Sequence, residues 1–220
     1  MQHPPKGETA REVIIGAMQL EGVLELPPEP TGLVIFAHGS GSSRFSARNN
    51  FVAGRLRGRG LGTLLFDLLT EPEAADRQNV FDIPLLAKRV VEAVDWARSD
   101  DEVSSLPIGL FGASTGAAAA LVAAANAPQA VSAVVSRGGR PDLAGAALPD
   151  VQAATLLVVG GADYGVIELN EAAFAELTCE KRLEIVAGAT HLFEEPGTLD
   201  VVVDLVGDWF VSHLAGAGQG

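Results

Sequence analysis

The sequence predicts an α/β fold in which a mostly parallel sheet carries helices on both faces. Apolar runs of strand length, bounded by Gly or Pro, alternate along the chain with segments of helical periodicity. These runs are continuously apolar rather than alternating, as expected of strands that helices cover on both faces. The six runs lie at residues 32–39, 62–68, 107–112, 131–138, 155–161 and 182–188.

Two shorter β-type runs precede this alternation, in REVIIGAMQLEGVLELP at residues 11–27. Polar and Gly residues break them, which indicates an N-terminal antiparallel hairpin. Helical periodicity is clearest further along the chain, where Leu86, Val90, Ala93 and Ala97 recur at steps of three and four residues. The predicted helices span residues 47–59, 84–98, 115–126, 166–177 and 199–213.

The length of 220 residues and the hydrophobic content of 48% are typical of one compact domain. We expect this domain over residues 11–214, with flexible tails at 1–10 and 215–220. Only the short segment GRPDLAGAALPDVQAA separates the runs at 131–138 and 155–161. We therefore expect no large cap domain, and an open site with little apolar surface for long acyl chains.

Charge and composition exclude several classes of partner. The formal net charge of −13 would repel a phosphate backbone or an anionic membrane, so we expect neither nucleic acid nor membrane as a partner. The first ten residues, MQHPPKGETA, lack the apolar core of a secretion signal, and Cys179 is the single cysteine. We expect a cytoplasmic protein in which Cys179 is structural.

Ser114 stands between the run at 107–112 and the predicted helix at 115–126, in the pentapeptide Gly-Ala-Ser-Thr-Gly. A Gly-x-Ser-x-Gly turn from a strand directly into a helix forces the serine into a strained conformation and exposes its hydroxyl. A side chain at either glycine would collide with the neighbouring strand or helix. The motif predicts that Ser114 is a nucleophile.

Asp163 and His191 come shortly after the runs at 155–161 and 182–188. Such positions in a parallel sheet share the crevice beyond the carboxyl ends of the strands. A serine hydroxyl needs a base to take its proton and a carboxylate to orient that base. The three residues together predict a catalytic triad with His191 as the base and Asp163 as the orienting acid.

Each residue of this triad also has a plainer interpretation. Ser114 alone would serve as a helix N-cap, Asp163 as a turn residue and His191 as a polar loop residue. Asp142, after the run at 131–138, is the alternative acid.

Two backbone N–H groups are candidates for an oxyanion hole. The N–H of Thr115 stands at a predicted helix N-terminus, where the helix dipole and an unpaired donor favour negative charge. The second donor would come from Ser40 or, as the alternative, from Gly41, in the loop after the run at 32–39.

The same loop supports a different function. Residues 37–44, AHGSGSSR, are one residue short of a dinucleotide-binding Gly-x-Gly-x-x-Gly pattern, and Asp67 follows at the spacing of a ribose-binding acid. A nucleotide-dependent oxidoreductase using the Gly39–Gly41 loop is therefore an alternative. Arg44 counts against it, because glycine or alanine normally occupies that position for close helix packing.

Arg44, Arg137 and Arg140 fall on predicted loops at the same end of the sheet. They suggest a substrate that bears a carboxylate or phosphate, with Arg44 and Arg137 as the candidate binding residues. In a chain this acidic, pairing with surface acids is an equally valid interpretation. The sequence contains no His, Cys and Asp cluster with metal-ligand spacing, and we expect no metal and no cofactor.

Four segments together resemble the α/β-hydrolase superfamily, and within it the dienelactone-hydrolase-like branch. They are VIFAHGSGSSRFSARN, GLFGASTGAAAAL, LLVVGGAD and GATHLFEEPG, and the resemblance extends from Thr31 to Phe210. More narrowly, the chain resembles the hydrolase domains fused to phosphoribosyltransferases in bacteria. The nucleophile differs, since dienelactone hydrolase itself has a cysteine where this chain has Ser114.

The resemblance implies an α/β-hydrolase fold with an eight-stranded sheet and the triad Ser114, Asp163 and His191. The triad itself predicts a serine-dependent carboxylic ester hydrolase acting on small esters or lactones. Because the nucleophile differs, the substrate of dienelactone hydrolase is not carried over, but the resemblance does imply a functional association with a phosphoribosyltransferase. A hydrolase-like module without catalysis is a further alternative. The oligomeric state and the natural substrate are left open.

Overall fold

The structure, a computed structural model, describes residues 9–214 and is built on an eight-stranded sheet. The strand order is β1-β2-β4-β3-β5-β6-β7-β8. Strands β3 to β8 run parallel, β1 pairs antiparallel with β2, and β2 pairs antiparallel with β4. The strands are β1 (Thr9–Ile15), β2 (Leu20–Leu26), β3 (Leu33–Ala37), β4 (Gly62–Phe66), β5 (Ile108–Ala113), β6 (Val131–Arg137), β7 (Ala154–Gly160) and β8 (Lys181–Val186).

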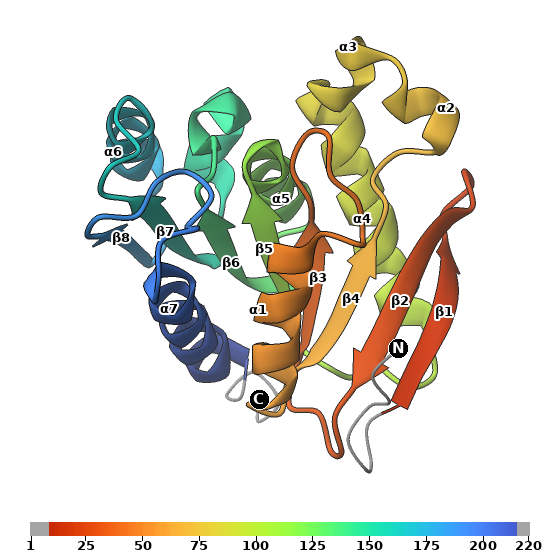
Figure 1. Ribbon diagram of the computed structural model, residues 1–220. Coiled ribbons are helices and arrows are strands. Elements are labelled where there is room, and N and C mark those ends of the chain that lie inside the picture. Colours follow the sequence, from red (N-terminus) through yellow and green to blue (C-terminus); the bar gives the residue numbers. More distant parts are fainter. Residues whose placement is uncertain (1–8, 215–220) are drawn as a thin grey trace.

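Helices cover both faces of this sheet (Figure 1). Helices α1 and α7 pack on one face, and α4, α5 and α6 pack on the other, where the 3₁₀ segment η1 contacts α5 and α6. Two four-residue helices, α2 and α3, lie above the carboxyl ends of the strands (Figure 1). The helices are α1 (Ala47–Arg57), α2 (Glu71–Ala74), α3 (Arg77–Val80), α4 (Ile83–Ser99), α5 (Thr115–Asn126), η1 (Pro141–Asp150), α6 (Val166–Glu176) and α7 (Thr198–Leu214).

The predicted fold class is confirmed: a mostly parallel sheet with an N-terminal antiparallel hairpin and helices on both faces. Each of the six predicted runs overlaps a strand. Strands β3 to β7 are almost entirely buried, as expected of strands covered on both faces, whereas the edge strand β8 is partly exposed and contains charged residues. Each of the five predicted helices is present within two residues of its expected ends. The segment between β6 and β7 holds only η1, consistent with the absence of a large cap there.

Three helical segments, α2, α3 and η1, were not predicted. Helices α2 and α3 have four residues each, too short for apolar periodicity to be visible, and they depend on caps. Thr70 and Glu73 form a capping box at α2, and the Asp76 side chain caps α3. At the N-terminus, β1 begins at Thr9, so residues 9 and 10 belong to the sheet rather than to the expected tail. The remainder of both expected tails lies outside the described residues.

Each face of the sheet has its own apolar core. Helix α5 packs against the sheet through small side chains, since Ala117, Ala118, Ala119 and Ala120 are all fully buried. Such side chains let the helix axis approach the strands closely. The opposite core contains larger residues, among them Phe111, and α7 packs there.

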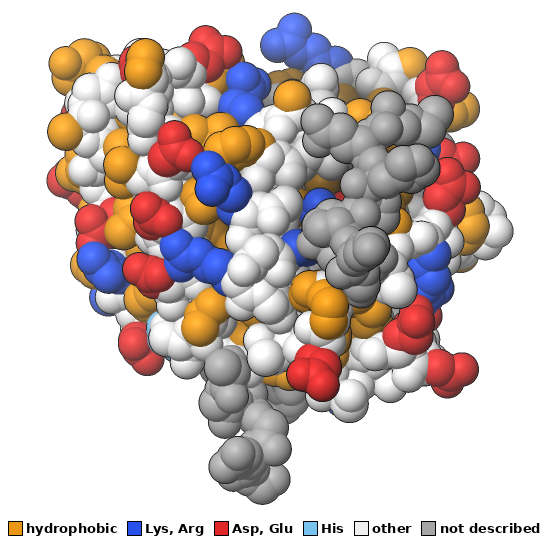
Figure 2. Space-filling model, turned by 60° about the horizontal axis from the view of Figure 1, so that its bottom comes forward, with side chains coloured by type: hydrophobic (Ala, Val, Ile, Leu, Met, Phe, Trp, Pro, Cys, Tyr) orange, Lys and Arg blue, Asp and Glu red, His pale blue; other side chains and the backbone are white. Residues whose placement is uncertain are grey.

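The lower end of the molecule, opposite α2 and α3, carries acidic and basic side chains interspersed with apolar ones (Figure 2). Ion pairs join α1 and the loop after it to α7, as between Arg55 and Asp200 and between Arg59 and Asp204. Within residues 9–214, no helix is both long enough and apolar enough to cross a bilayer.

A glycine in the central strand sets how closely α7 approaches the sheet. A Cβ added at Gly109 would lie 2.6 Å from Cε1 of Phe210. We expect Gly109→Ala to lower the free energy of unfolding by about 1–3 kcal/mol, because the buried Phe210 ring cannot move away without strain. Urea denaturation followed by circular dichroism measures the change.

Gly54→Ala is the matched control. Gly54 lies on the exposed side of α1, where an added Cβ would be 3.7 Å from its nearest neighbour, Nη2 of Arg57. This substitution should raise the free energy of unfolding by about 0.5–1 kcal/mol through helix propensity. Equal effects of the two substitutions would contradict the close packing of α7.

Candidate active site

Ser114 forms the turn between β5 and α5 with strained backbone geometry. Its φ of 52° and ψ of −123° lie in a region that L-residues rarely adopt. Although Ser114 is the N-cap residue of α5, its side chain makes no capping hydrogen bond. The hydroxyl is therefore not used to start the helix, unlike that of Ser46, which accepts a hydrogen bond from Asn49 N–H at α1.

Two glycines make this turn sterically feasible. A Cβ at Gly112 would lie 2.4 Å from Cα of Ala117, and a Cβ at Gly116 would lie 2.2 Å from the carbonyl oxygen of Ala37. Both contacts are with backbone atoms, which cannot rotate away. The collisions expected from the sequence are present, one with helix α5 and the other with the end of β3.

His191 and Asp163 are hydrogen-bonded to each other. Nδ1 of His191 lies 2.7 Å from Oδ2 of Asp163, with Asp163 in the loop after β7 and His191 in the loop after β8. The Asp163 side chain is 11% exposed and the His191 side chain 37%. A carboxylate accepts only, so Nδ1 of His191 carries the proton and Nε2 is the ring nitrogen left for a further partner.

Ser114 and His191 line one cavity of about 260 Å³, together with Ser40, Arg48 and Arg137. The alternative acid, Asp142, does not face this cavity. Its two carboxylate oxygens accept hydrogen bonds of 2.8 Å from the guanidinium of Arg140.

Both residues expected to supply oxyanion donors lie near this serine. Thr115 is the buried first residue of α5, and Ser40 lines the same cavity as Ser114. The loop of Ser40 abuts the serine directly, because a Cβ at Gly39 would be 2.9 Å from Cβ of Ser114. Gly41 has a φ of 68° and open space around its Cα, so it is free to turn the loop.

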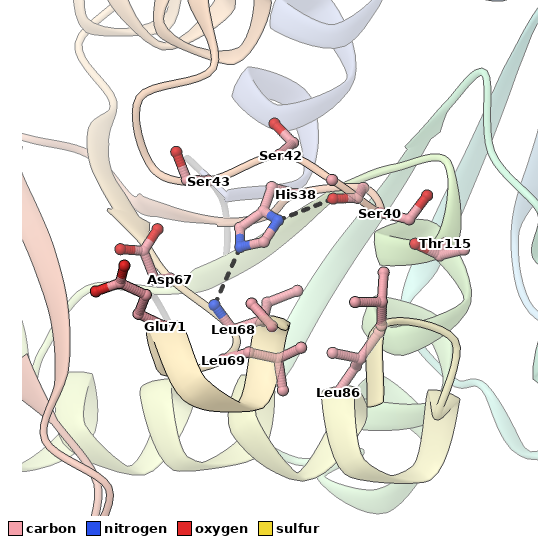
Figure 3. A pocket seen from close by; sticks show the side chains of 14 residues that line it. His38, Ser40, Ser42, Ser43, Asp67, Leu68, Leu69, Glu71, Leu86 and Thr115 are labelled. Atoms are coloured by element: carbon pink, nitrogen blue, oxygen red, sulfur yellow. Dashed lines mark hydrogen bonds between the residues drawn. The ribbon is translucent and has the colours of Figure 1, made fainter. Parts of the chain in front are cut away.

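His38 holds that loop in place (Figure 3). Its Nε2 accepts a hydrogen bond of 3.1 Å from Leu68 N–H, and its Nδ1 lies 3.0 Å from the carbonyl oxygen of Gly39. A backbone N–H can only donate, so Nε2 is unprotonated and Nδ1–H donates to Gly39. Burial lowers the pKa of His38, although the Gly39 carbonyl and the Asp67 carboxylate act in the opposite direction. The neutral ring thereby ties the end of β3 to the end of β4.

A second, largely apolar cavity of about 380 Å³ adjoins the first and shares Gly39, Ser40 and Ser42 with it (Figure 3). Sequence reasoning missed it, because its wall comes from the α2–α3 segment and from the ends of β4 and α4. Buried Arg89 of α4 pairs with Glu73 of α2 at 2.9 Å, which anchors this wall. The apolar side chains that line the cavity are Leu68, Leu69, Ala74, Val80 and Leu86.

Two of the three arginines singled out from the sequence are paired with acids. Arg44 forms ion pairs with Asp67 and Glu21, and it does not line the cavity that contains Ser114. Asp67, which resembled a ribose-binding acid, is thus held by the Arg44 side chain and also accepts the Arg44 N–H. Arg140 is paired with Asp142.

Arg137 differs from both. It ends β6, is 6% exposed and lines the cavity beside Ser114. Its contacts are a hydrogen bond of 3.4 Å to Oδ1 of Asn49 and the ring of Phe193, whose centroid is 5.8 Å from Cζ. Burial, followed by repulsion from Arg48, lowers the pKa of Arg137 to about 10. The side chain still carries its charge at neutral pH.

The acids after His191 have local roles. Glu194 pairs with Arg48 at 3.2 Å, and Glu195 accepts hydrogen bonds from both the N–H and the hydroxyl of Thr190. These bonds from Thr190 hold the pKa of Glu195 below its usual range and close the turn that carries His191.

Outside the site, Cys179 is a free, half-buried thiol whose Sγ lies 3.7 Å from Oγ1 of Thr155. Among residues 9–214 there is no group of three His, Cys, Asp or Glu side chains that could hold a metal ion.

One sequence family and several solved structures resemble this chain. The sequence model of the dienelactone hydrolase family matches residues 21–203. The crystal structure of a dienelactone hydrolase from Anabaena variabilis superimposes with a TM-score of 0.90 at 54% identity, covering 94% of this chain and 98% of that one. An α/β serine hydrolase without a lid, from Xanthomonas campestris, has the same fold with a TM-score of 0.76 at 20% identity, covering 97% of this chain and 98% of that one.

Two curated proteins, from the CDC 1551 and H37Rv strains of Mycobacterium tuberculosis, are 55% identical over 215 residues. Their names contain the words phosphoribosyl transferase. The match covers 98% of this chain and 48% of each relative, so the chain spans about half the length of these relatives.

The burial of His38 predicts how stability responds to acid. The pKa of His38 is lowered in the folded protein, so the unfolded chain takes up a proton at a pH where the folded protein does not. The free energy of unfolding should therefore fall as the pH drops below about 6.5, with a contribution from His38 of at most about 1.4 kcal/mol per pH unit.

The variant His38→Gln removes the titrating group while offering an amide oxygen to Leu68 N–H. Its free energy of unfolding, measured by urea titration between pH 7 and pH 5, should depend less steeply on pH than that of the wild type. Identical slopes for the two proteins would show that His38 does not stay neutral in the fold.

Proposed function

Because the chain belongs to the dienelactone hydrolase family, we propose that it is a serine hydrolase that cleaves small carboxylic esters or lactones through an acyl-enzyme on Ser114. The observation that carries the proposal is the pairing of His191 with Asp163 at 2.7 Å on the cavity that Ser114 also lines. The strained turn and the uncommitted hydroxyl of Ser114 support it.

In this mechanism Nε2 of His191 takes the proton of Ser114 Oγ while the oxygen attacks the ester carbonyl carbon. The C–O bond of the ester then breaks, and the alcohol leaves with the proton from Nε2. Water next gives a proton to Nε2 and attacks the acyl carbon, and Ser114 Oγ regains its proton as the acid leaves. Asp163 keeps the imidazole in the tautomer with a proton on Nδ1 and stabilises the imidazolium.

The negative oxygen of each tetrahedral intermediate lies between the backbone N–H groups of Thr115 and Ser40. The α5 N-terminus places a partial positive charge there. The other donor depends on the loop that His38 holds through the Gly39 carbonyl. Ser40 lines both cavities, and this supports its role as an oxyanion donor. A substrate whose reacting carbonyl lies at Ser40 would have space on either side.

We assign the apolar part of the substrate to the cavity lined by Leu68, Leu69 and Leu86. Its volume of about 380 Å³ suits a short or medium apolar group. This is more apolar surface than the sequence led us to expect at an open site.

A functional association with a phosphoribosyltransferase is a second part of the proposal. It is supported by the names of the mycobacterial relatives, of which this chain covers about half.

The structure weakens the alternative of a nucleotide-dependent oxidoreductase. Asp67, the residue at the spacing of a ribose-binding acid, is engaged by Arg44.

A fluorophosphonate probe tests the nucleophile. We expect the wild-type protein to be labelled and to hydrolyse short p-nitrophenyl esters. Ser114→Ala should not be labelled, and kcat should fall by about 10³-fold or more, since loss of a triad serine costs up to about 10⁶-fold elsewhere. Ser104→Ala removes an exposed hydroxyl in the turn before β5 and should retain labelling and activity.

Persistent labelling of Ser114→Ala would assign the nucleophile to another residue. A wild-type protein that neither labels nor cleaves any ester would favour the module without catalysis, and stabilisation by a nicotinamide dinucleotide in that protein would favour the oxidoreductase.

A further inference from the structure

Arg137 is a buried cation that pairs with no carboxylate of the described residues. Among residues 9–214, its guanidinium contacts the amide oxygen of Asn49 and the ring of Phe193, and its Nε has no hydrogen-bond partner. Arg89 is similarly buried, but its charge is neutralised by ion pairs with Glu73 and Glu92.

An uncompensated buried charge is strongly unfavourable. The chain contains 28 acidic residues, so acids to pair with Arg137 are plentiful. A buried guanidinium on a cavity-lining residue, neutralised by none of the described acids, is typical of a group whose counter-ion is a ligand.

A second positive feature faces the same cavity. Ser46, Arg48 and Asn49, at the N-terminal end of the 11-residue helix α1, line it together with Arg137. The first turn of α1 contains no acidic residue, so nothing there offsets the positive end of the helix dipole. Within the described part of the chain, Arg48 forms an ion pair with Glu194 at 3.2 Å, and the Glu194 side chain is 64% exposed.

We propose that Arg137, Arg48 and the N-terminus of α1 form an anion subsite, and that the ester cleaved at Ser114 carries a carboxylate or phosphate group bound there. The inference rests on the proposed hydrolase function and names the substrate class. Carboxylate and phosphate share the chemistry required, because each presents oxygen atoms that a guanidinium binds in a fork-like arrangement.

The two cavities define how such a substrate lies. The cavity of about 260 Å³ contains the positive groups, and the cavity of about 380 Å³ is largely apolar, with Ser40 common to both. A substrate with a small anionic group on one side of its ester and an apolar group on the other would fill both. Arg44, the other arginine considered from the sequence, takes no part, since Asp67 and Glu21 neutralise it.

The test compares esters of one alcohol whose acyl groups end in a methyl, a carboxylate or a phosphate. We expect kcat/KM for at least one anionic ester to exceed that for the neutral ester. Arg137→Met and Arg48→Met should each lower the anionic-to-neutral ratio by about tenfold, the effect of one charge-assisted hydrogen bond. Arg55→Met, at an exposed ion pair on the same helix, should leave the ratio as it is in the wild type.

Inorganic phosphate provides a readout that needs no hydrolysis. Phosphate should raise the Tm of the wild type and of Arg55→Met relative to sodium chloride at equal ionic strength, and this rise should vanish in Arg48→Met and Arg137→Met. If Arg137→Met does not fold, Arg48→Met, at a half-exposed residue, is sufficient for both the ester comparison and the Tm comparison.

The outcomes separate the two proposals. Cleavage of the neutral ester with a ratio that neither arginine variant changes would overturn the subsite and leave the hydrolase function standing. Phosphate binding that depends on Arg48 and Arg137, in a protein that cleaves no ester, would support the subsite and overturn the hydrolase function.

Discussion

The left-handed backbone of Ser114 is the constraint on which the rest of the structure depends. A non-glycine residue at φ 52° costs about 1–3 kcal/mol, and it persists only where the surroundings leave no alternative. Here β3, β5 and α5 meet so closely that Gly112 and Gly116 have no space for a side chain. The alanine-rich face of α5 is part of the same requirement, because a helix with larger side chains could not approach the sheet at this point.

The strand order converts this local turn into a site. Parallel strands end at the same edge of the sheet, so residues far apart in sequence become neighbours there. Ser40 follows β3, Ser114 follows β5, Arg137 ends β6, Asp163 follows β7 and His191 follows β8. In a chain with a net charge of −13, the N-terminus of α1 and two arginines make one end of this crevice locally positive.

Much of this arrangement could be predicted from residue patterns, because the central strands are buried and apolar and because Ser114, Asp163 and His191 each follow the end of a strand. What could not be predicted depends on contacts between distant segments. Arg44 and Arg137 look alike in the sequence, since both are arginines near strand ends. In the structure, Arg44 pairs with Asp67, whereas Arg137 contacts the amide of Asn49. The apolar cavity was missed because its wall rests on helices of four residues.

The central claim is that the fold holds Ser114 in a strained turn for a chemical purpose and not to begin a helix. The free energy of unfolding of Ser114→Gly, measured by urea denaturation, tests it most directly. Glycine adopts this conformation without strain, so the account predicts a protein more stable than the wild type by about 1 kcal/mol and without hydrolase activity. A variant less stable than the wild type would contradict the account, because loss of a useful N-cap would then be the larger effect.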